Sequence, residues 1–239
     1  MTPFAWMLLA TTASGACMVV GGLVALDRRR RPHWMEQELR HGVIAFGGGV
    51  LLAAVALVLL PQGLDALPHP AASAACFVGG GLAVFAVERQ LGLRRRESPQ
   101  FAAMLLDYVP ESLALGGMFA AGVAQAPLLA LLIGLQNLPE GFNACRERLA
   151  VPGTRPAAVI RQMALLVPLG PVLAALSWWG LSGFPEVLGA IMLAAAGGIL
   201  YLIFQDIAPM SRLKRHRAPP LGAVLGFAVA LVGQQVVGG

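Results

Sequence analysis

The sequence predicts an all-α membrane protein, a single bundle of eight transmembrane helices. Of its 239 residues, 57% are hydrophobic and only 12% are charged, and the mean hydropathy is +0.73, well above the range of ordinary globular domains. Apolar runs long enough to cross a hydrocarbon core of about 30 Å as helices recur along the chain. The weak ten-residue alternation that marks outer-membrane strands is absent from the sequence.

The apolar runs define the expected spans and leave no room for a separate soluble domain. We expect spans at about residues 3–26, 41–62, 71–88, 101–123, 126–145, 159–181, 184–208 and 219–237. The whole chain, 1–239, is therefore expected to form one transmembrane domain. Clusters of small residues such as Gly47 to Gly49 and Gly79 to Gly81 would let the helix backbones approach closely. Three cysteines without CxxC spacing indicate neither a disulfide framework nor a thiolate metal site.

Basic residues alternate between the loops in a way that predicts topology. All 17 lysines and arginines follow odd-numbered spans, and the loops at 61–70, 122–127 and 182–186 contain none. They are Arg28 to Arg31, Arg40, Arg89, Arg94 to Arg96, Arg146, Arg148, Arg155, Arg161, Arg212, Lys214, Arg215 and Arg217. The positive-inside rule places these loops in the cytoplasm and both termini outside the cell membrane. The net charge of +5 is thus a sign of orientation in a lipid bilayer and not of nucleic-acid binding.

Two copies of one polar pattern interrupt the fourth and fifth spans. The first is Asp107-Tyr108-Val109-Pro110-Glu111-Ser112, and the second is Gln136-Asn137-Leu138-Pro139-Glu140-Gly141. In each copy a polar residue and a glutamate lie four apart, which places both on one face of a helix. The proline between them donates no N–H, so a carbonyl one turn earlier loses its helical partner. Each copy should therefore form a compact, oxygen-rich spot.

Both motifs are expected near the middle of the bilayer. At 1.5 Å per residue, Asp107 and Glu111 lie roughly 9–15 Å from the inner face, and Gln136 and Glu140 roughly 15–21 Å from the outer face. Carboxylates within the hydrocarbon layer cost about 2.5–3.5 kcal/mol each on insertion scales, and they mark ion or proton paths. With Asn137, the set offers three carboxylates and two amides, which suits a divalent cation. The alternative is a pair of structural acids that bond to neighbouring backbone.

These residues resemble the ZIP (Zrt/Irt-like) family of divalent metal transporters, whose fourth and fifth spans carry His-Asn-x-Pro-Glu-Gly-type motifs. Val109-Pro110-Glu111 and Asn137-Leu138-Pro139-Glu140-Gly141 match that pattern. The stretch 47–54 followed by Leu60-Pro61 is similar to the second span of the family, and 197–201 followed by 206–209 is similar to its seventh. The resemblance implies eight spans, a metal site between spans four and five, transport toward the cytoplasm and a homodimer.

The chain departs from the family pattern within the site. Asp107 and Gln136 stand where the family has histidines, and Tyr108 and Ser112 replace an asparagine and a glycine. Val167 stands where a glutamate usually precedes the proline of span six. The resemblance therefore implies that a primary metal site is kept and that a neighbouring second site is lost. Carboxylate and amide oxygens in place of imidazole favour manganese, magnesium or iron over zinc, although zinc also accepts carboxylates.

The two motifs and the resemblance together imply a set of metal ligands and an inner exit. The expected metal ligands are Asp107, Glu111, Gln136, Asn137 and Glu140, and Gln205 and Asp206 are expected to line the inner end of the transport pathway. The alternative for Asp206 is an ion pair with an interfacial arginine. Asp206 occupies a position in span seven where the family carries an acid, usually glutamate.

The leading functional prediction is secondary transport of a divalent metal cation, with the metal as substrate and no enzymatic activity. ATP is not expected to drive it, because the sequence has no GxxxxGK[ST] motif. A second class is a non-transporting ZIP-like membrane protein with a degenerate metal site. An intramembrane metal hydrolase would need a pattern such as HExxH, but all four histidines lie in loops or at span ends.

Overall fold

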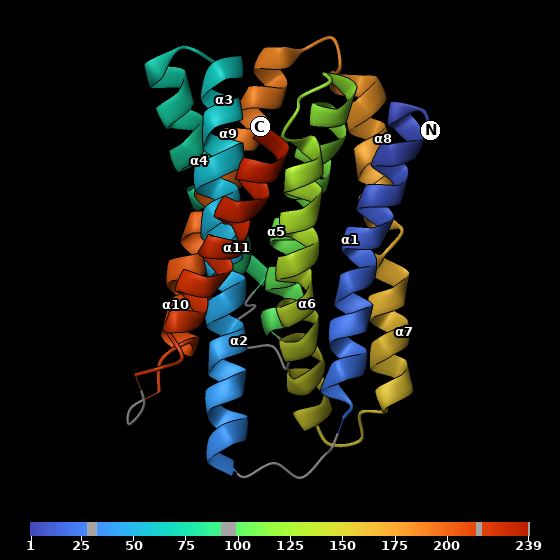
Figure 1. The fold of residues 1–239 in the computed structure, drawn as a ribbon, viewed down its shortest axis with the longest axis vertical. Coiled ribbons are helices and arrows are strands. Elements are labelled where there is room, and N and C mark those ends of the chain that lie inside the picture. Colours follow the sequence, from blue (N-terminus) through green and yellow to red (C-terminus); the bar gives the residue numbers. More distant parts are fainter. Residues whose placement is uncertain (28–32, 92–98, 214–216, 239) are drawn as a thin grey trace.

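The computed structural model describes residues 1–27, 33–91, 99–213 and 217–238 of the chain (Figure 1). This part of the chain is helical and contains no strand, which confirms the predicted all-α class. The helices are α1 (Pro3–Ala25), α2 (His33–Ala53), α3 (Leu60–Ala66), α4 (Pro70–Leu91), α5 (Pro99–Ala120), α6 (Ala126–Ala150), α7 (Pro156–Leu166), α8 (Leu169–Leu181), α9 (Pro185–Leu202), α10 (Ala208–Met210) and α11 (Leu221–Gly238). Two π-helical stretches, η1 (Ala54–Leu59) and η3 (Ile203–Ile207), join α2 to α3 and α9 to α10.

Within the described residues, five helical segments are long and apolar enough to cross a membrane. They are Pro3–Ala25, Glu38–Ala66, Pro70–Gln90, Pro156–Leu181 and Pro185–Met210. The described part of α11, Leu221–Val237, is also apolar but shorter. The chain is therefore a membrane-embedded helical bundle. Helices also occupy the predicted ranges of spans four and five, but α5 and α6 carry the two polar motifs, which lowers their hydropathy. The count of eight spans stays a prediction.

Local sequence explains where these helices begin and turn. Proline stands at the first position of α1, α4, α5, α7 and α9, where its missing N–H costs nothing and its fixed φ suits the helix. The short connection between α5 and α6 turns at Gly122, whose φ of 68° lies in the left-handed region that favours glycine. This tight turn makes α5 and α6 antiparallel neighbours, so the two motifs run in opposite directions.

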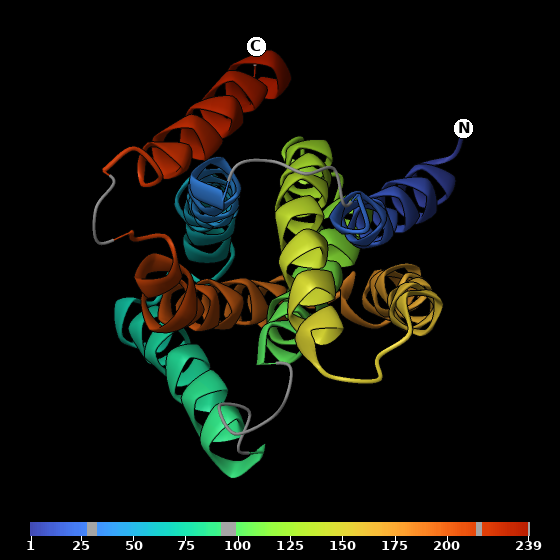
Figure 2. The same ribbon diagram turned by 90° about the horizontal axis from the view of Figure 1, so that it is seen from below.

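α5 and α6 lie at the centre of the bundle when it is viewed along its axis (Figure 2). α1 packs against α6 and α8 against α5 on one side, while α2 and α9 border the pair on the other. α4 and α11 are outermost, packed on α9 and α2. The contact of α1 with α6 is very close, since a Cβ added at Gly141 would run into the Met18 carbonyl. Glycine therefore sets how α6 sits against α1.

The two ends of the bundle differ in charge. The loops 67–69, 121–125 and 182–184 lie at the end where α1 begins and α11 ends (Figure 1), and they contain no lysine or arginine. The described basic residues belong to the other end, near the start of α2 and α7 and near the ends of α4, α6 and α10. Other residues of that prediction lie outside the described part of the chain: Arg28 to Arg31, Arg94 to Arg96, Lys214 and Arg215. Which end faces the cytoplasm stays a prediction.

The interior also differs between the two ends. In the half away from the basic residues, α5 and α6 are sealed together by fully buried apolar side chains, among them Leu115, Met118, Leu128 and Leu132. In the half near the basic residues, the polar motifs meet a cavity. The fold thus places a closed apolar half above a polar, partly open half.

Candidate functional site

The antiparallel arrangement of α5 and α6 pairs the two motifs crosswise. Within each motif the two polar positions are four residues apart, or about 6 Å along the helix. Because the helices run in opposite directions, the first polar residue of one motif lies level with the glutamate of the other. Glu111 thus meets Gln136, and Asp107 meets Glu140. The site has two levels, each with one residue from each helix.

The deeper level is the Glu111–Gln136 pair, and both side chains are fully buried. Gln136 Nε2 donates to Glu111 Oε1 at 2.7 Å and to Glu111 Oε2 at 2.6 Å. Gln136 Oε1 has no hydrogen-bond partner. Glu111 is therefore fully engaged by protein atoms, at the expense of one unpaired amide oxygen.

The second level is the Asp107–Glu140 pair, one turn nearer the basic end. The two carboxyl groups lie within hydrogen-bonding reach of each other. Asp107 Oδ1 and Glu140 Oε2 are buried and have no hydrogen-bond partner. Two adjacent carboxyl groups that are shielded from water do not both stay ionised without a counter-ion, so a proton or a cation is expected between them. At this level, in contrast to the deeper one, both carboxyl groups keep an oxygen without a partner.

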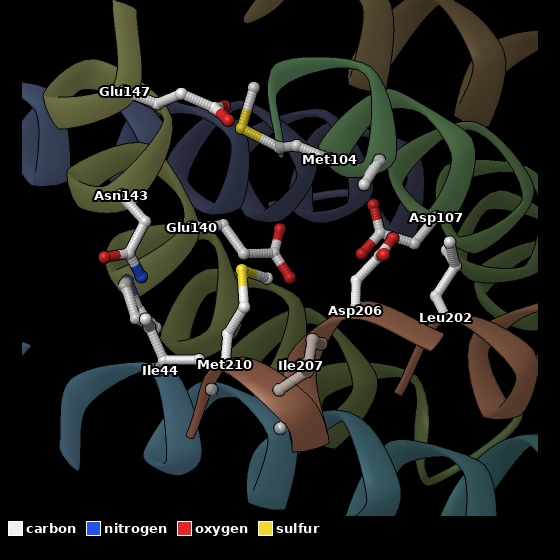
Figure 3. A pocket seen from close by; sticks show the side chains of 14 residues that line it. Ile44, Met104, Asp107, Glu140, Asn143, Glu147, Leu202, Asp206, Ile207 and Met210 are labelled. Carbon is white, nitrogen blue, oxygen red and sulfur yellow. The ribbon is translucent and has the colours of Figure 1, made fainter. Parts of the chain in front are cut away.

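Asp107 and Glu140 line a cavity of about 120 Å³ (Figure 3). Its walls come from α2, α5, α6 and the α9–α10 segment, including Gly47 and Gly48 of α2. In Figure 3 the carboxyl group of Asp206 points toward that of Asp107, and Glu140 reaches into the same space. Asp206 thus lies in the same cavity as Asp107 and Glu140, and its role as an inner pathway residue stays a prediction. Gln205 is half-buried on η3 and does not line this cavity.

Two polar residues of the cavity were not predicted from the sequence. Asn143 and Glu147 of α6 also line it, farther along the helix from Glu140 (Figure 3). The signal was present, because Glu140, Asn143 and Glu147 are spaced i, i+3 and i+7, which is one face of a helix. Met104 of α5 also lines the cavity. It lies three residues before Asp107, so the two share one face of α5. The α6 wall of the cavity therefore carries a polar strip that extends toward the basic end.

The remaining predicted ligand, Asn137, turns toward another helix. Its Nδ2 donates to the Ser14 carbonyl of α1 at 3.0 Å, and its Oδ1 has no hydrogen-bond partner. Tyr108, its counterpart in the first motif, also points away, with its hydroxyl in a notch between Gly15 and Gly170. A Cβ at either glycine would collide with that hydroxyl. These two positions hold α5 and α6 against α1 and α8.

The five predicted ligands thus fall into three places, a sealed pair, a cavity pair and Asn137. Within the described residues, no three histidine, cysteine, aspartate or glutamate side chains are grouped so that they could hold a metal ion. Metal ligation by these residues stays a prediction.

Comparisons with known proteins add no assignment to this geometry. No model of a known protein family matches the chain, and no curated protein matches it.

Proposed function

We propose that this chain is a ZIP-like membrane transporter that moves a divalent metal cation toward the cytoplasm between its fourth and fifth spans. The proposal includes eight spans with both termini outside the cell membrane, and a homodimer. One observation carries it: two carboxyl groups with unpartnered oxygens, Asp107 and Glu140, face a cavity within a membrane-embedded bundle. Acids at membrane depth that face a bundle interior mark ion or proton pathways.

The chemistry of the cavity favours a cation as cargo. Asp107, Glu140 and Asp206 contribute carboxylate oxygens, and Asn143 contributes an amide. Hard oxygen ligands suit Mn²⁺, Mg²⁺ or Fe²⁺, and zinc also accepts them. A cation at Asp107 and Glu140 would remove the mutual repulsion of the two carboxylates. Because no imidazole is present, we favour Mn²⁺ or Fe²⁺ over Zn²⁺ as the preferred cargo.

The inner pathway follows from the same cavity. Glu140, Asp206 and Glu147 are each partly exposed, whereas Glu111 and Gln136 are sealed. A cation that leaves Asp107 and Glu140 would pass Asp206 and Glu147 on its way to the basic end. A succession of weak, shared carboxylate sites lets an ion move without being trapped at one of them.

A non-transporting protein with a degenerate metal site is the second candidate. It is favoured by the absence of a group of three metal-binding side chains within the described residues. Such a protein would bind a cation weakly at Asp107 and Glu140 and would not release it on the other side.

Uptake of Mn²⁺ into proteoliposomes that contain a fluorescent chelator separates the two candidates. The transporter predicts uptake that Glu140→Gln reduces to background and that Asp206→Asn slows without loss of Mn²⁺ binding. Glu186→Gln is the matched control, because Glu186 is an exposed residue in the first turn of α9, at the opposite end. Binding of Mn²⁺ without uptake by the wild-type protein would support the non-transporting candidate.

A further inference from the structure

The contact between Gln136 and Glu111 has the geometry of a bound cation. Gln136 Nε2 lies 2.7 Å and 2.6 Å from the two carboxylate oxygens, so it sits close to the axis that bisects them. A metal ion held by both oxygens of one carboxylate occupies this axis, at about 2.3–2.6 Å for calcium. A carboxylate only accepts hydrogen bonds, so the amide presents its nitrogen and two partly positive hydrogens.

The surroundings of this contact favour a positively charged or hydrogen-bond-donating partner for Glu111. Glu111 and Gln136 have no solvent exposure, and Asp107 and Glu140 are near enough to act on Glu111 electrostatically. A buried carboxylate without a partner is strongly unfavourable, and nearby carboxylates increase that cost. Neither Glu111 nor Gln136 lines the cavity. Water and cargo therefore do not reach Glu111 from the cavity, and the amide is its partner.

We propose that Gln136 is a built-in substitute for a cation at Glu111, and that it withholds this carboxylate from the cargo. The bundle then folds without metal at its deeper level. The cargo meets Asp107 and Glu140 without the additional carboxylate of Glu111, which favours a weakly held, rapidly released ion. This role in transport rests on the proposed function, but the substitution of a cation by the amide does not.

Asn137 provides a matched control, because it is the neighbouring buried amide on α6. Its Nδ2 bonds to a backbone carbonyl, that of Ser14, and not to a carboxylate. Loss of this amide removes a hydrogen bond but leaves no buried negative charge. A cation should therefore replace the Gln136 amide and should not replace the Asn137 amide.

Thermal unfolding of the purified full-length chain in detergent, in EDTA and in Mn²⁺, tests the proposal. Gln136→Met should lower the Tm by several degrees in EDTA, and Mn²⁺ should raise the Tm of this variant by more than it raises the wild-type Tm. Asn137→Leu should also lower the Tm, but its response to Mn²⁺ should equal that of the wild type. The double variant Glu111→Met with Gln136→Met should lose the additional response, because the carboxylate is gone.

A response to Mn²⁺ that is the same in Gln136→Met and in the wild type would overturn the proposal. If Gln136→Met does not fold in EDTA, its preparation with Mn²⁺ present throughout decides the matter. Folded protein is then expected only in the Mn²⁺ preparation, and its absence from both preparations would contradict the inference. The wild-type response reports on cation binding at the cavity, and transport itself is measured by uptake, so a wild type that shows no uptake, or no response to Mn²⁺, would contradict the proposed function and still leave the difference between the variants.

Discussion

The two levels of the site have nearly the same composition but differ in their hydrogen bonding. Each level joins one residue of α5 to one of α6, and each holds a glutamate from a proline-containing motif. At the deeper level, both oxygens of Glu111 accept hydrogen bonds from Gln136. At the cavity level, Asp107 and Glu140 face each other, and each keeps an unpartnered oxygen. The two levels differ in the partner of the glutamate. Glu111 faces an amide that donates to both of its oxygens, whereas Glu140 faces another carboxyl group and keeps one oxygen without a partner.

This comparison shows that a buried acid is not informative by itself. What decides its role is whether the protein supplies a donor for it. A carboxylate with a donor stabilises the fold, because its removal would leave that donor unpaired. A pair of carboxyl groups that each keep an unpartnered oxygen weakens the fold and is ready to bind a proton or a cation.

The largest expected effect is a contrast in stability between the two levels. Glu111→Met should destabilise the protein by about 1–3 kcal/mol, because the buried amide of Gln136 loses its acceptors. Asp107→Leu should leave the stability unchanged or raise it, because a carboxyl group with an unpartnered oxygen is replaced by an apolar side chain beside a cavity. Denaturation of both variants in EDTA, with the wild type as reference, measures the difference. Equal losses of stability in Glu111→Met and Asp107→Leu would contradict the distinction between a paired and an unpaired carboxyl group.

An intermediate effect is expected from pH. A protonated carboxyl group does not bind a cation, so affinity for Mn²⁺ should rise with pH and fall as protons occupy Asp107 and Glu140. The slope should approach about tenfold per pH unit for each proton that the cation displaces. Calorimetric titration of Mn²⁺ at a series of pH values measures it, with Asp107→Asn expected to flatten the profile. A flat profile in the wild type would exclude carboxylate ligation.

The smallest effect concerns selectivity between zinc and manganese. Imidazole nitrogen suits zinc, whereas carboxylate oxygen suits manganese. Asp107→His should therefore raise the affinity for Zn²⁺ relative to Mn²⁺, because this position faces the cavity. Gln136→His should change the ratio much less, because that position faces Glu111 in the sealed level. Competition between Zn²⁺ and Mn²⁺ for binding to each variant measures the two changes in the affinity ratio. A larger change in Gln136→His than in Asp107→His would mean that Gln136 contacts the transported ion.

Local sequence was sufficient to predict much of this fold. Apolar runs, prolines at helix starts and a short glycine turn at Gly122 determine where helices form and which of them are neighbours. The four-residue spacing within each motif determines that its two polar side chains share a face. These features depend on residues close together in the chain, so they could be read without the structure. The spacing of Glu140, Asn143 and Glu147 is also a local feature of the sequence, although it was not predicted.

The sequence by itself determined an all-helical, membrane-embedded chain with acids on the facing sides of α5 and α6, and only the tertiary structure decided which of those acids are satisfied. Hydrogen bonding across two helices depends on their rotation and on their axial register to within a fraction of a turn. The approach of α1 to α6 at Gly21 and Gly141 is so close that a Cβ at either position would collide with backbone, and in this packing Asn137 donates to the Ser14 carbonyl. The packing of α5 against α6 pairs Gln136 with Glu111. No spacing within one helix contains that information, because it arises from side chains and backbones far apart in the sequence.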